Sequence, residues 1–217
     1  MDEKTLIARR VAQELRPGYL VNLGIGLPTL VAAMVPREAG IFFQSENGII
    51  GMQAVAEEGL EADDLTDAGG NHISALPGSA TFDSAISFGF IRGGHLDVTV
   101  LGGLQVDHLG RLANWMVPGV LVPGMGGAMD LVTGARRVIV AMTHTARGTP
   151  KIVEKCTLPL TSQRRVDLIV TELAVIEPVA DGLLLKELAP GVALETVQHS
   201  TGAKLLIPSH VSTMRFL

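Results

Sequence analysis

Residues 19–35 read YLVNLGIGLPTLVAAMV, an apolar run that is interrupted by two glycines and a proline. The first part, 19–23, predicts a buried strand. The part that follows Pro28 predicts a short buried helix, because proline is tolerated in the first helical turn. A strand that leads through a glycine turn into a helix is typical of α/β folds. We therefore expect strands and helices to alternate along the rest of the chain.

The same alternation continues on both sides of this stretch. Asp2 is a candidate cap for a helix that ends before Pro17-Gly18. Further helices are predicted at about 80–92, at 127–133 and in VALETVQHSTGA. Strands are predicted in IFFQ (41–44), in LDVTVLGGLQV from about residue 96, and in RVIVAM, VDLIVT, LAVIEP and GLLLKEL. The last strands complete the sheet or form a small antiparallel extension.

This order of elements predicts the architecture. We expect a single domain over residues 1–217, built as an open three-layer α/β/α sandwich with a mostly parallel sheet. Residues 52–78 are rich in Gly, Asp and Glu and have no clean period, so they predict a long surface excursion without regular elements. DHLG at 107–110 predicts a turn.

Composition excludes several classes of protein. Of the 217 residues, 47% are hydrophobic and 18% charged, which indicates a compact core rather than disorder. The net charge is −5 and the basic residues are scattered, so the sequence shows no basic patch that would bind nucleic acid or an anionic membrane. No window approaches the roughly 18 uninterrupted apolar residues of a spanning helix. The N-terminus lacks the apolar region of a signal peptide, so we expect a cytoplasmic protein.

Glu46 is the first candidate for chemistry. It lies in FFQSENGIIG (42–51), where its neighbours are apolar, small or turn-forming. Asn47-Gly48 favours residues with positive φ, which predicts a sharp turn just after the acid and presents the carboxylate at a strand end. Such a carboxylate could act as a base or a nucleophile. The alternative is a glutamate that only caps a turn or pairs with an arginine.

A dinucleotide-binding turn is a second interpretation. Gly24 and Gly26 match the first two glycines of the fingerprint, and Glu46 lies 22 residues after Gly24, where a ribose-binding acid is expected. Two features disfavour it. Thr29 replaces the third glycine, and Pro28 removes a backbone donor from the helix start that would hold a pyrophosphate. A nucleotide-dependent oxidoreductase therefore stays the alternative.

The glycine-rich stretch PGMGGAMDLV (123–132) is a third candidate. Consecutive glycines before a helix can direct backbone N–H groups at an anion, as an oxyanion hole requires. A close packing turn between elements is the competing explanation. The two arginine pairs, Arg136-Arg137 and Arg164-Arg165, either neutralise an anionic ligand or form a solvated surface. The six histidines show no spacing typical of a metal site, and the single cysteine excludes a Cys-based cluster within this chain.

Taken together, these motifs resemble a known family. FQSENGIIG is similar to the active-site motif of the β subunit of family I CoA-transferases of the 3-oxoacid type. The resemblance runs from about residue 4 to residue 200 and includes VNLGIGLPTLVA, FDSAISF, IRGGHLDV, LANWMVPG and PGMGGAMDLV. Within the family the likeness is to the bacterial acetate/acetoacetate type. Succinyl-CoA:3-ketoacid and 3-oxoadipate transferases share the same motifs.

The resemblance implies a ping-pong transfer of coenzyme A from an acyl-CoA to a short carboxylic acid. Glu46 is the implied nucleophile and forms first an acyl-glutamyl anhydride and then a glutamyl-CoA thioester. The anhydride is reactive, so no metal or redox cofactor is expected. A glutamate is normally ionised at neutral pH and needs positioning and oxyanion donors more than a base.

The resemblance also implies further site residues and a partner. The backbone N–H of Gly127, with Gly126 beside it, is the implied oxyanion donor. Asn47, Gly24 and Gly26 are expected near the acyl group or CoA. We expect a separate α subunit, an α2β2 assembly and no activity of this chain alone. A ligand-sensing subunit that has lost catalysis is a further alternative, which the intact FQSENG motif disfavours.

Overall fold

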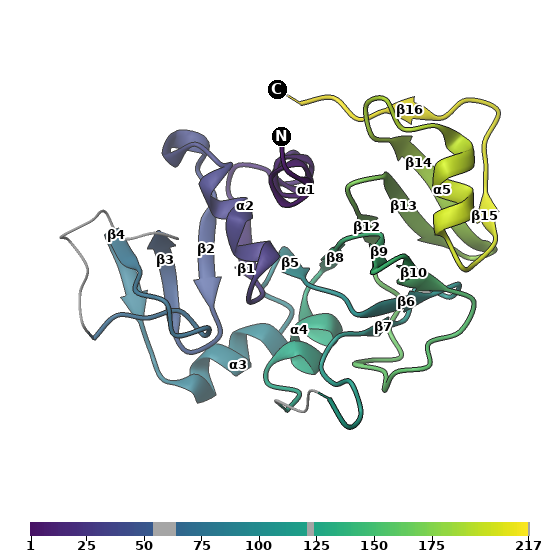
Figure 1. Cartoon of the computed structure of the whole chain (residues 1–217). Coiled ribbons are helices and arrows are strands. Elements are labelled where there is room, and N and C mark those ends of the chain that lie inside the picture. The colour runs from purple at the N-terminus through teal and green to yellow at the C-terminus, as the bar shows by residue number, and fades with distance from the viewer. Residues whose placement is uncertain (54–63, 121–123, 217) are drawn as a thin grey trace.

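The computed structural model describes residues 1–53, 64–120 and 124–216, and its centre is an 11-stranded sheet (Figure 1). Parallel strands form the middle of this sheet, in the order β2, β1, β5, β8, β12. Their bounds are Phe42–Ser45 for β2, Leu20–Leu23 for β1, Val98–Leu101 for β5, Arg137–Ala141 for β8 and Leu168–Val170 for β12.

Both edges of the sheet are largely antiparallel. One edge continues from β2 into β3 (Ile49–Gln53) and β4 (Ser74–Thr81). The other continues from β12 into β13 (Ala174–Val179) and β14 (Gly182–Leu188), which β15 (Leu205–Leu206) and β16 (Ser212–Thr213) join in parallel. Two small sheets stand apart, formed by β11 (Ile152–Val153), β6 (Gln105–Asp107) and β7 (Leu112–Ala113), and by β9 (Thr145–Ala146) and β10 (Thr149–Pro150).

The helices are short, and their ends follow the local sequence. Asp2 accepts a hydrogen bond from the Thr5 N–H at 3.0 Å and so caps α1 (Glu3–Ala12), as predicted. Asp83 caps α3 (Ser84–Arg92) in the same way. The others are α2 (Leu30–Ala33), α4 (Ala128–Gly134) and α5 (Leu194–Ser200), with 3-10 turns η1 (Leu27–Thr29) and η2 (Arg37–Ala39). None of the helices in the described ranges is long and apolar enough to cross a membrane.

Side chains of the parallel strands alternate between two hydrophobic cores. Ile139 and Ala141 of β8 pack into the core that α1 and α2 cover, whereas Val138 and Val140 pack into the core that α3, α4 and α5 cover. Since every second residue points to the opposite face, a strand buried on both sides needs a helical layer on each. The predicted three-layer α/β/α sandwich with a mostly parallel sheet is therefore confirmed.

The prediction for residues 52–78 was wrong at both ends. β3 extends to Gln53 and β4 begins at Ser74, so the sheet continues where the sequence predicted only a surface excursion; the part at 54–63 lies outside the described residues. Helix α3 begins at Ser84 rather than at about 80, because residues 80 and 81 pair with β3. Most of β4 is exposed or half-buried, so its sequence lacks the apolar alternation that signals a strand.

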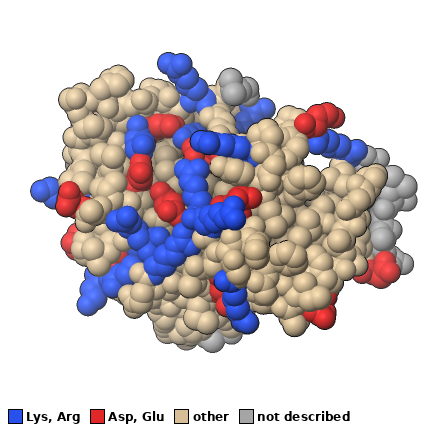
Figure 2. Space-filling view, turned by 180° about the vertical axis from the view of Figure 1, so that it is seen from behind, with Lys and Arg blue, Asp and Glu red and all other residues tan. Residues whose placement is uncertain are grey.

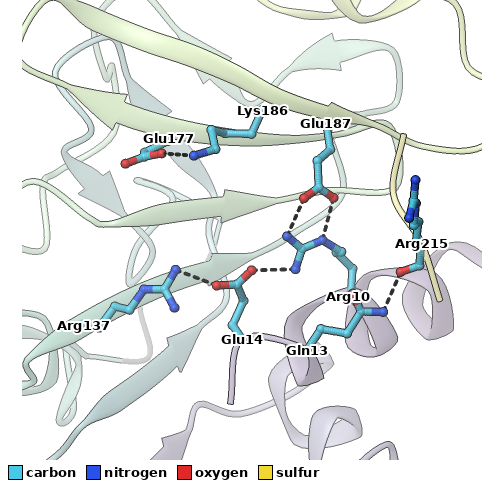
Figure 3. A network of polar contacts seen from close by, with 8 residues as sticks. All are labelled: Arg10, Gln13, Glu14, Arg137, Glu177, Lys186, Glu187 and Arg215. Carbon is cyan, nitrogen blue, oxygen red and sulfur yellow. Dashed lines mark hydrogen bonds and ion pairs between the residues drawn. The ribbon is translucent and has the colours of Figure 1, made fainter. Parts of the chain in front are cut away.

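A network of charged side chains joins α1 to the sheet (Figure 3). The Arg10 guanidinium donates to both carboxylate oxygens of Glu187 on β14, at 2.7 and 2.8 Å, and to Glu14 at 2.7 Å. Glu14 in turn accepts from Arg137 on β8 at 2.6 Å. The Arg10 side chain is only 8% exposed. Bidentate pairing of an almost buried guanidinium fixes the helix relative to two strands that are far apart in sequence.

The arginine pairs Arg136-Arg137 and Arg164-Arg165 lie near the amino ends of β8 and β12, beside this network. Figure 2 shows Lys and Arg side chains gathered on one part of the back face, with Asp and Glu side chains among them. Arg136 pairs with Asp97 at 2.8 Å, and Arg164 donates to the backbone carbonyls of Val132, Ala135 and Arg136. With the Arg137–Glu14 contact, most of these cations already have partners within the chain. Arg136, Arg137 and Arg164 therefore contribute to the fold.

The charged network makes a testable contribution to stability. Replacing Arg10 with Met leaves the half-buried carboxylates of Glu14 and Glu187 without their main partner. We expect the free energy of unfolding, measured by urea denaturation, to fall by about 3 kcal/mol. The matched control is Arg136→Met, which removes a largely exposed ion pair and should cost less than about 1 kcal/mol. Equal losses in the two variants would contradict this role of Arg10.

Candidate active site

The turn after β2 holds Glu46 at the carboxyl end of a central parallel strand. The Gly48 N–H donates to the Ser45 carbonyl at 3.0 Å, so Glu46 and Asn47 are the two central residues of this turn. Gly48 has φ +125°, and a Cβ at this position would lie 1.9 Å from the Phe82 carbonyl oxygen. Only glycine fits there, which confirms the sharp turn that Asn47-Gly48 predicted.

The Glu46 side chain is half-buried and has a defined partner on the neighbouring strand. Asn22 of β1 donates from Nδ2 to Glu46 Oε2 at 3.1 Å. Parallel pairing of β1 and β2 places Asn22 opposite Gln44, two residues before the acid. One carboxylate oxygen is therefore held from within the sheet, while the side chain remains partly accessible.

Gly127 lies on the other side of Glu46. A Cβ at Gly127 would lie 3.3 Å from Glu46 Cγ and 3.2 Å from Cζ of Phe88, so its backbone closely approaches both side chains. No described residue accepts a hydrogen bond from the N–H of Gly126 or Gly127. The glycine stretch thus brings two backbone donors, without an acceptor among the described residues, to the neighbourhood of a carboxylate, which is the arrangement that an oxyanion hole needs.

The remaining predicted site residues also follow the carboxyl ends of the central strands β1 and β2. The N–H of Gly24 donates to the Val100 carbonyl at 2.8 Å, and this residue is buried. Gly26 is exposed, with φ +87° and open space around its Cα. Asn47 is exposed and donates from Nδ2 to the Thr66 carbonyl at 2.7 Å. The Gly24 N–H is therefore not free to bind a ligand. Gly26 and Asn47 are exposed, and their predicted contacts with the acyl group or CoA stay predictions.

The sequence analysis missed Asn22 and Phe88. Asn22 was visible as a polar residue inside the apolar strand YLVNL, an unusual choice for a strand buried on both faces. Phe88 gave no such signal, because an aromatic residue in an amphipathic helix is ordinary core material. Its position against Gly127 depends on how α3 and α4 pack.

A second polar cluster lies at the carboxyl ends of β8 and β12. The ring of the fully buried His144 contacts the hydroxyls of Thr171 and Thr201, each at 2.9 Å. Its backbone N–H donates to the carboxylate of Glu172. Burial, with a smaller effect of the nearby Lys151, lowers the pKa of His144 from 6.5 to about 4. The imidazole is therefore neutral at pH 7 and serves packing and hydrogen bonding.

Comparison with known proteins agrees with this geometry. Residues 4–200 match the coenzyme A transferase family. The chain is 54% identical over 216 residues to the beta subunit of acetate CoA-transferase from Escherichia coli K12, covering 99% of both chains. The chain belongs to the coenzyme A transferase family. It is 49% identical over 199 residues to the B-type subunit of succinyl-CoA:3-ketoacid coenzyme A transferase from Helicobacter pylori 26695, covering 91% of this chain and 96% of that one.

Solved structures of the family share the fold. An acyl-CoA transferase apoenzyme from Escherichia coli O157:H7 superimposes with a TM-score of 0.78 at 26% identity, over 99% of this chain. The match spans only 43% of that longer chain. These likenesses make the chain a CoA-transferase subunit of the β type and give the dinucleotide-dependent oxidoreductase no support. Glu46 and Gly127 thus come together in a fold that carries CoA transfer.

The neutral state of His144 predicts how stability depends on pH. Between pH 6.5 and 4 the unfolded chain binds a proton at this histidine and the folded chain does not, so its contribution to stability is lost as the pH falls. We expect the melting temperature of the wild type to fall more steeply from pH 7 to 5 than that of His144→Asn. His199→Asn, at an exposed histidine of α5, is the control and should follow the wild type. Identical slopes in all three proteins would refute the prediction.

Proposed function

We propose that this chain is the catalytic β subunit of a CoA-transferase and that Glu46 is its nucleophile. The observation that carries this proposal is the position of Glu46 on a glycine-dependent turn, between the Asn22 amide and the backbone of Gly127. Relatives are named for acetate and for succinyl-CoA and a 3-ketoacid. The substrates that fit are therefore a short-chain acyl-CoA and a short carboxylic acid, with acetate and acetoacetate first.

The proposed reaction begins with attack of the Glu46 carboxylate on the thioester carbonyl of the acyl-CoA. The acyl–sulfur bond breaks, and an acyl-glutamyl anhydride and the CoA thiolate result. The thiolate then attacks the glutamyl carbonyl, which releases the first acid and leaves a glutamyl-CoA thioester. The second acid reverses these steps. Neither step needs a base, a metal or a redox cofactor, because the nucleophile is already an anion and the anhydride is reactive.

Stabilisation of the developing oxyanion is the second requirement of this chemistry. We assign it to the backbone N–H of Gly127, with Gly126 beside it, because both donors are uncommitted in the described part of the chain. One such donor contributes about 2.7 to 4 kcal/mol to transition-state stabilisation. The missing side chain at Gly127 matters as well, because any Cβ would crowd the nucleophile.

A separate α subunit completes the proposed enzyme. Relatives of the same length are named as single subunits of their enzymes, and the related acyl-CoA transferase chain is more than twice as long as the part matched here. We infer an α2β2 assembly with the active site near the contact between the two kinds of chain. The β chain by itself should be inactive.

The glutamyl-CoA intermediate is the decisive test. The complex of this chain with its co-expressed α partner is incubated with acetoacetyl-CoA and then treated with borohydride. We expect a CoA adduct on the peptide that contains Glu46 before reduction, and loss of activity after it. Glu46→Ala should lose at least about 10⁴-fold in kcat, since no other group supplies the nucleophile.

Two outcomes would end the proposal. One is full activity of Glu46→Ala, and the other is absence of the adduct from an active wild-type enzyme. A ligand-sensing subunit would instead show neither adduct nor turnover. Glu195→Ala, at an exposed glutamate of α5, is the matched control and should behave as the wild type.

A further variant tests the contact between Gly127 and Glu46. Gly127 has φ −80°, which suits alanine, so Gly127→Ala should fold normally. Its methyl group displaces the Glu46 side chain, and a displacement of the nucleophile approaching 1 Å is expected to lower kcat by about 10²-fold. Gly89→Ala, which adds a methyl into open space on α3, is the control. Wild-type turnover in Gly127→Ala would show that this contact is unimportant.

A further inference from the structure

A cluster of polar side chains lies inside the sheet directly beneath Glu46. Asn22, Gln44, Thr99 and Ser87 are each 0% exposed, although they sit on β1, β2, β5 and α3 among apolar neighbours. Polar groups this deep destabilise a protein unless all of them are hydrogen-bonded. All four are hydrogen-bonded to one another in a chain, and apolar side chains would fill the same space without this requirement. The cluster therefore has a role beyond packing.

The hydrogen bonds of this cluster fix one orientation of the Asn22 amide. Its Nδ2 donates to Gln44 Oε1 at 2.9 Å and to Glu46 Oε2 at 3.1 Å, while its Oδ1 accepts from the Thr99 hydroxyl at 3.3 Å. If the amide turned over, its oxygen would face two acceptor oxygens and its NH₂ would face the hydroxyl. The Glu46 carboxylate and the Gln44 carbonyl, which can only accept, thus select the orientation in which an N–H points at Glu46, and the Thr99 hydroxyl donates to the amide oxygen and holds it there.

Gln44 extends this arrangement to helix α3. Its Oε1 accepts from Asn22, and its Nε2 donates to the Ser87 hydroxyl at 2.9 Å. Ser87 precedes Phe88, the residue whose ring lies against the Gly127 backbone on the other side of Glu46. The buried cluster therefore links the two sides of the candidate active site through one continuous set of hydrogen bonds and contacts.

We propose that Asn22 is a catalytic residue, whose Nδ2–H stabilises negative charge on Glu46 Oε2 when the glutamyl carbonyl carbon is attacked. Thr99 and Gln44 are positioning residues that act through Asn22. This inference rests on the proposed function, because it requires Glu46 to be the nucleophile. It adds a side-chain donor inside the sheet to the backbone donor of Gly127.

The step can be followed atom by atom. Since Oε2 is held by Asn22, Oε1 attacks the acyl-CoA and becomes the bridging oxygen of the anhydride, and Oε2 remains the glutamyl carbonyl oxygen. The CoA thiolate then forms a carbon–sulfur bond to the glutamyl Cδ, and the carbonyl electron pair moves onto Oε2. When this pair returns, the bond from Cδ to the bridging oxygen breaks and the first acid leaves as a carboxylate. No proton is transferred, so a fixed hydrogen-bond donor is the assistance this step needs.

The experiment uses the complex with the α partner and acetoacetyl-CoA as the probe. Asn22→Ala should lower kcat and the rate of adduct formation on the Glu46 peptide by about 10²- to 10³-fold, the usual effect of one oxyanion donor. KM should change by less than about threefold, because the donor acts mainly after substrate binding. Rapid quenching followed by mass spectrometry measures the adduct, and thermal melting checks the fold.

A second pair of variants keeps the inference falsifiable if Asn22→Ala does not fold. Thr99→Val retains the shape but removes the hydroxyl that holds the amide oxygen of Asn22 in place, and should lower kcat by about tenfold. Thr99→Ser restores the hydroxyl and should recover most of that loss. Thr196→Val, at an exposed position of α5, is the control and should match the wild type.

The outcomes separate this inference from the proposed function. If the wild type forms the Glu46 adduct but a folded Asn22→Ala retains wild-type kcat and adduct rate, the role of Asn22 is refuted and the nucleophile stands. If Thr99→Val retains them, the positioning role of Thr99 is refuted. If an active wild type forms no adduct on Glu46, the proposed function fails first, and this inference with it. A loss in Thr99→Val that Thr99→Ser does not recover would also refute the positioning role of the hydroxyl.

Discussion

Parallel pairing of β1 with β2 is the constraint on which the candidate active site depends. Its register places Asn22 opposite Gln44, and β5 on the other side of β1 brings Thr99 beside Asn22. These polar side chains then meet one another in a sheet whose buried side chains are mostly apolar. β2 ends at Ser45, so Glu46 is the first residue beyond its carboxyl end. The Glu46 carboxylate lies there in contact with the amide of Asn22. Strand order and register thus decide where the Glu46 carboxylate lies.

Close approach of backbone segments supports the same site from outside the sheet. At Gly48 the turn lies against the Phe82 carbonyl, and at Gly127 the start of α4 lies against Glu46 and Phe88. A side chain at either position would displace the turn or the Glu46 side chain. The two glycines therefore do different work: Gly48 permits a backbone conformation, whereas Gly127 leaves room for a neighbouring side chain.

The two ends of the parallel strands have different tasks. At the amino ends of β8 and β12, arginines and carboxylates neutralise one another, and the Arg10 network ties α1 to β14 and β8 (Figure 3). At the carboxyl ends lie Glu46, the N–H groups of Gly126 and Gly127, which have no acceptor in the described part of the chain, and the neutral His144. Ligands of open α/β sheets bind at the carboxyl ends of the strands, and here the stabilising charges are kept at the opposite end.

The sequence by itself determined the local features of this protein. The strand–turn–helix pattern, the Asp2 cap, the turn at Asn47-Gly48 and the position of Glu46 at a strand end follow from neighbouring residues, and the family resemblance supplied the chemistry. Only the tertiary structure decided the contacts of Glu46 with Asn22 and Gly127, the burial of Gln44 and Thr99, and the ion pairs of the arginines. These contacts join residues on different elements, so they depend on the order and register of strands and on helix packing. The strand β4 also became visible only there, because pairing with β3 rather than an apolar pattern of its own holds it in the sheet.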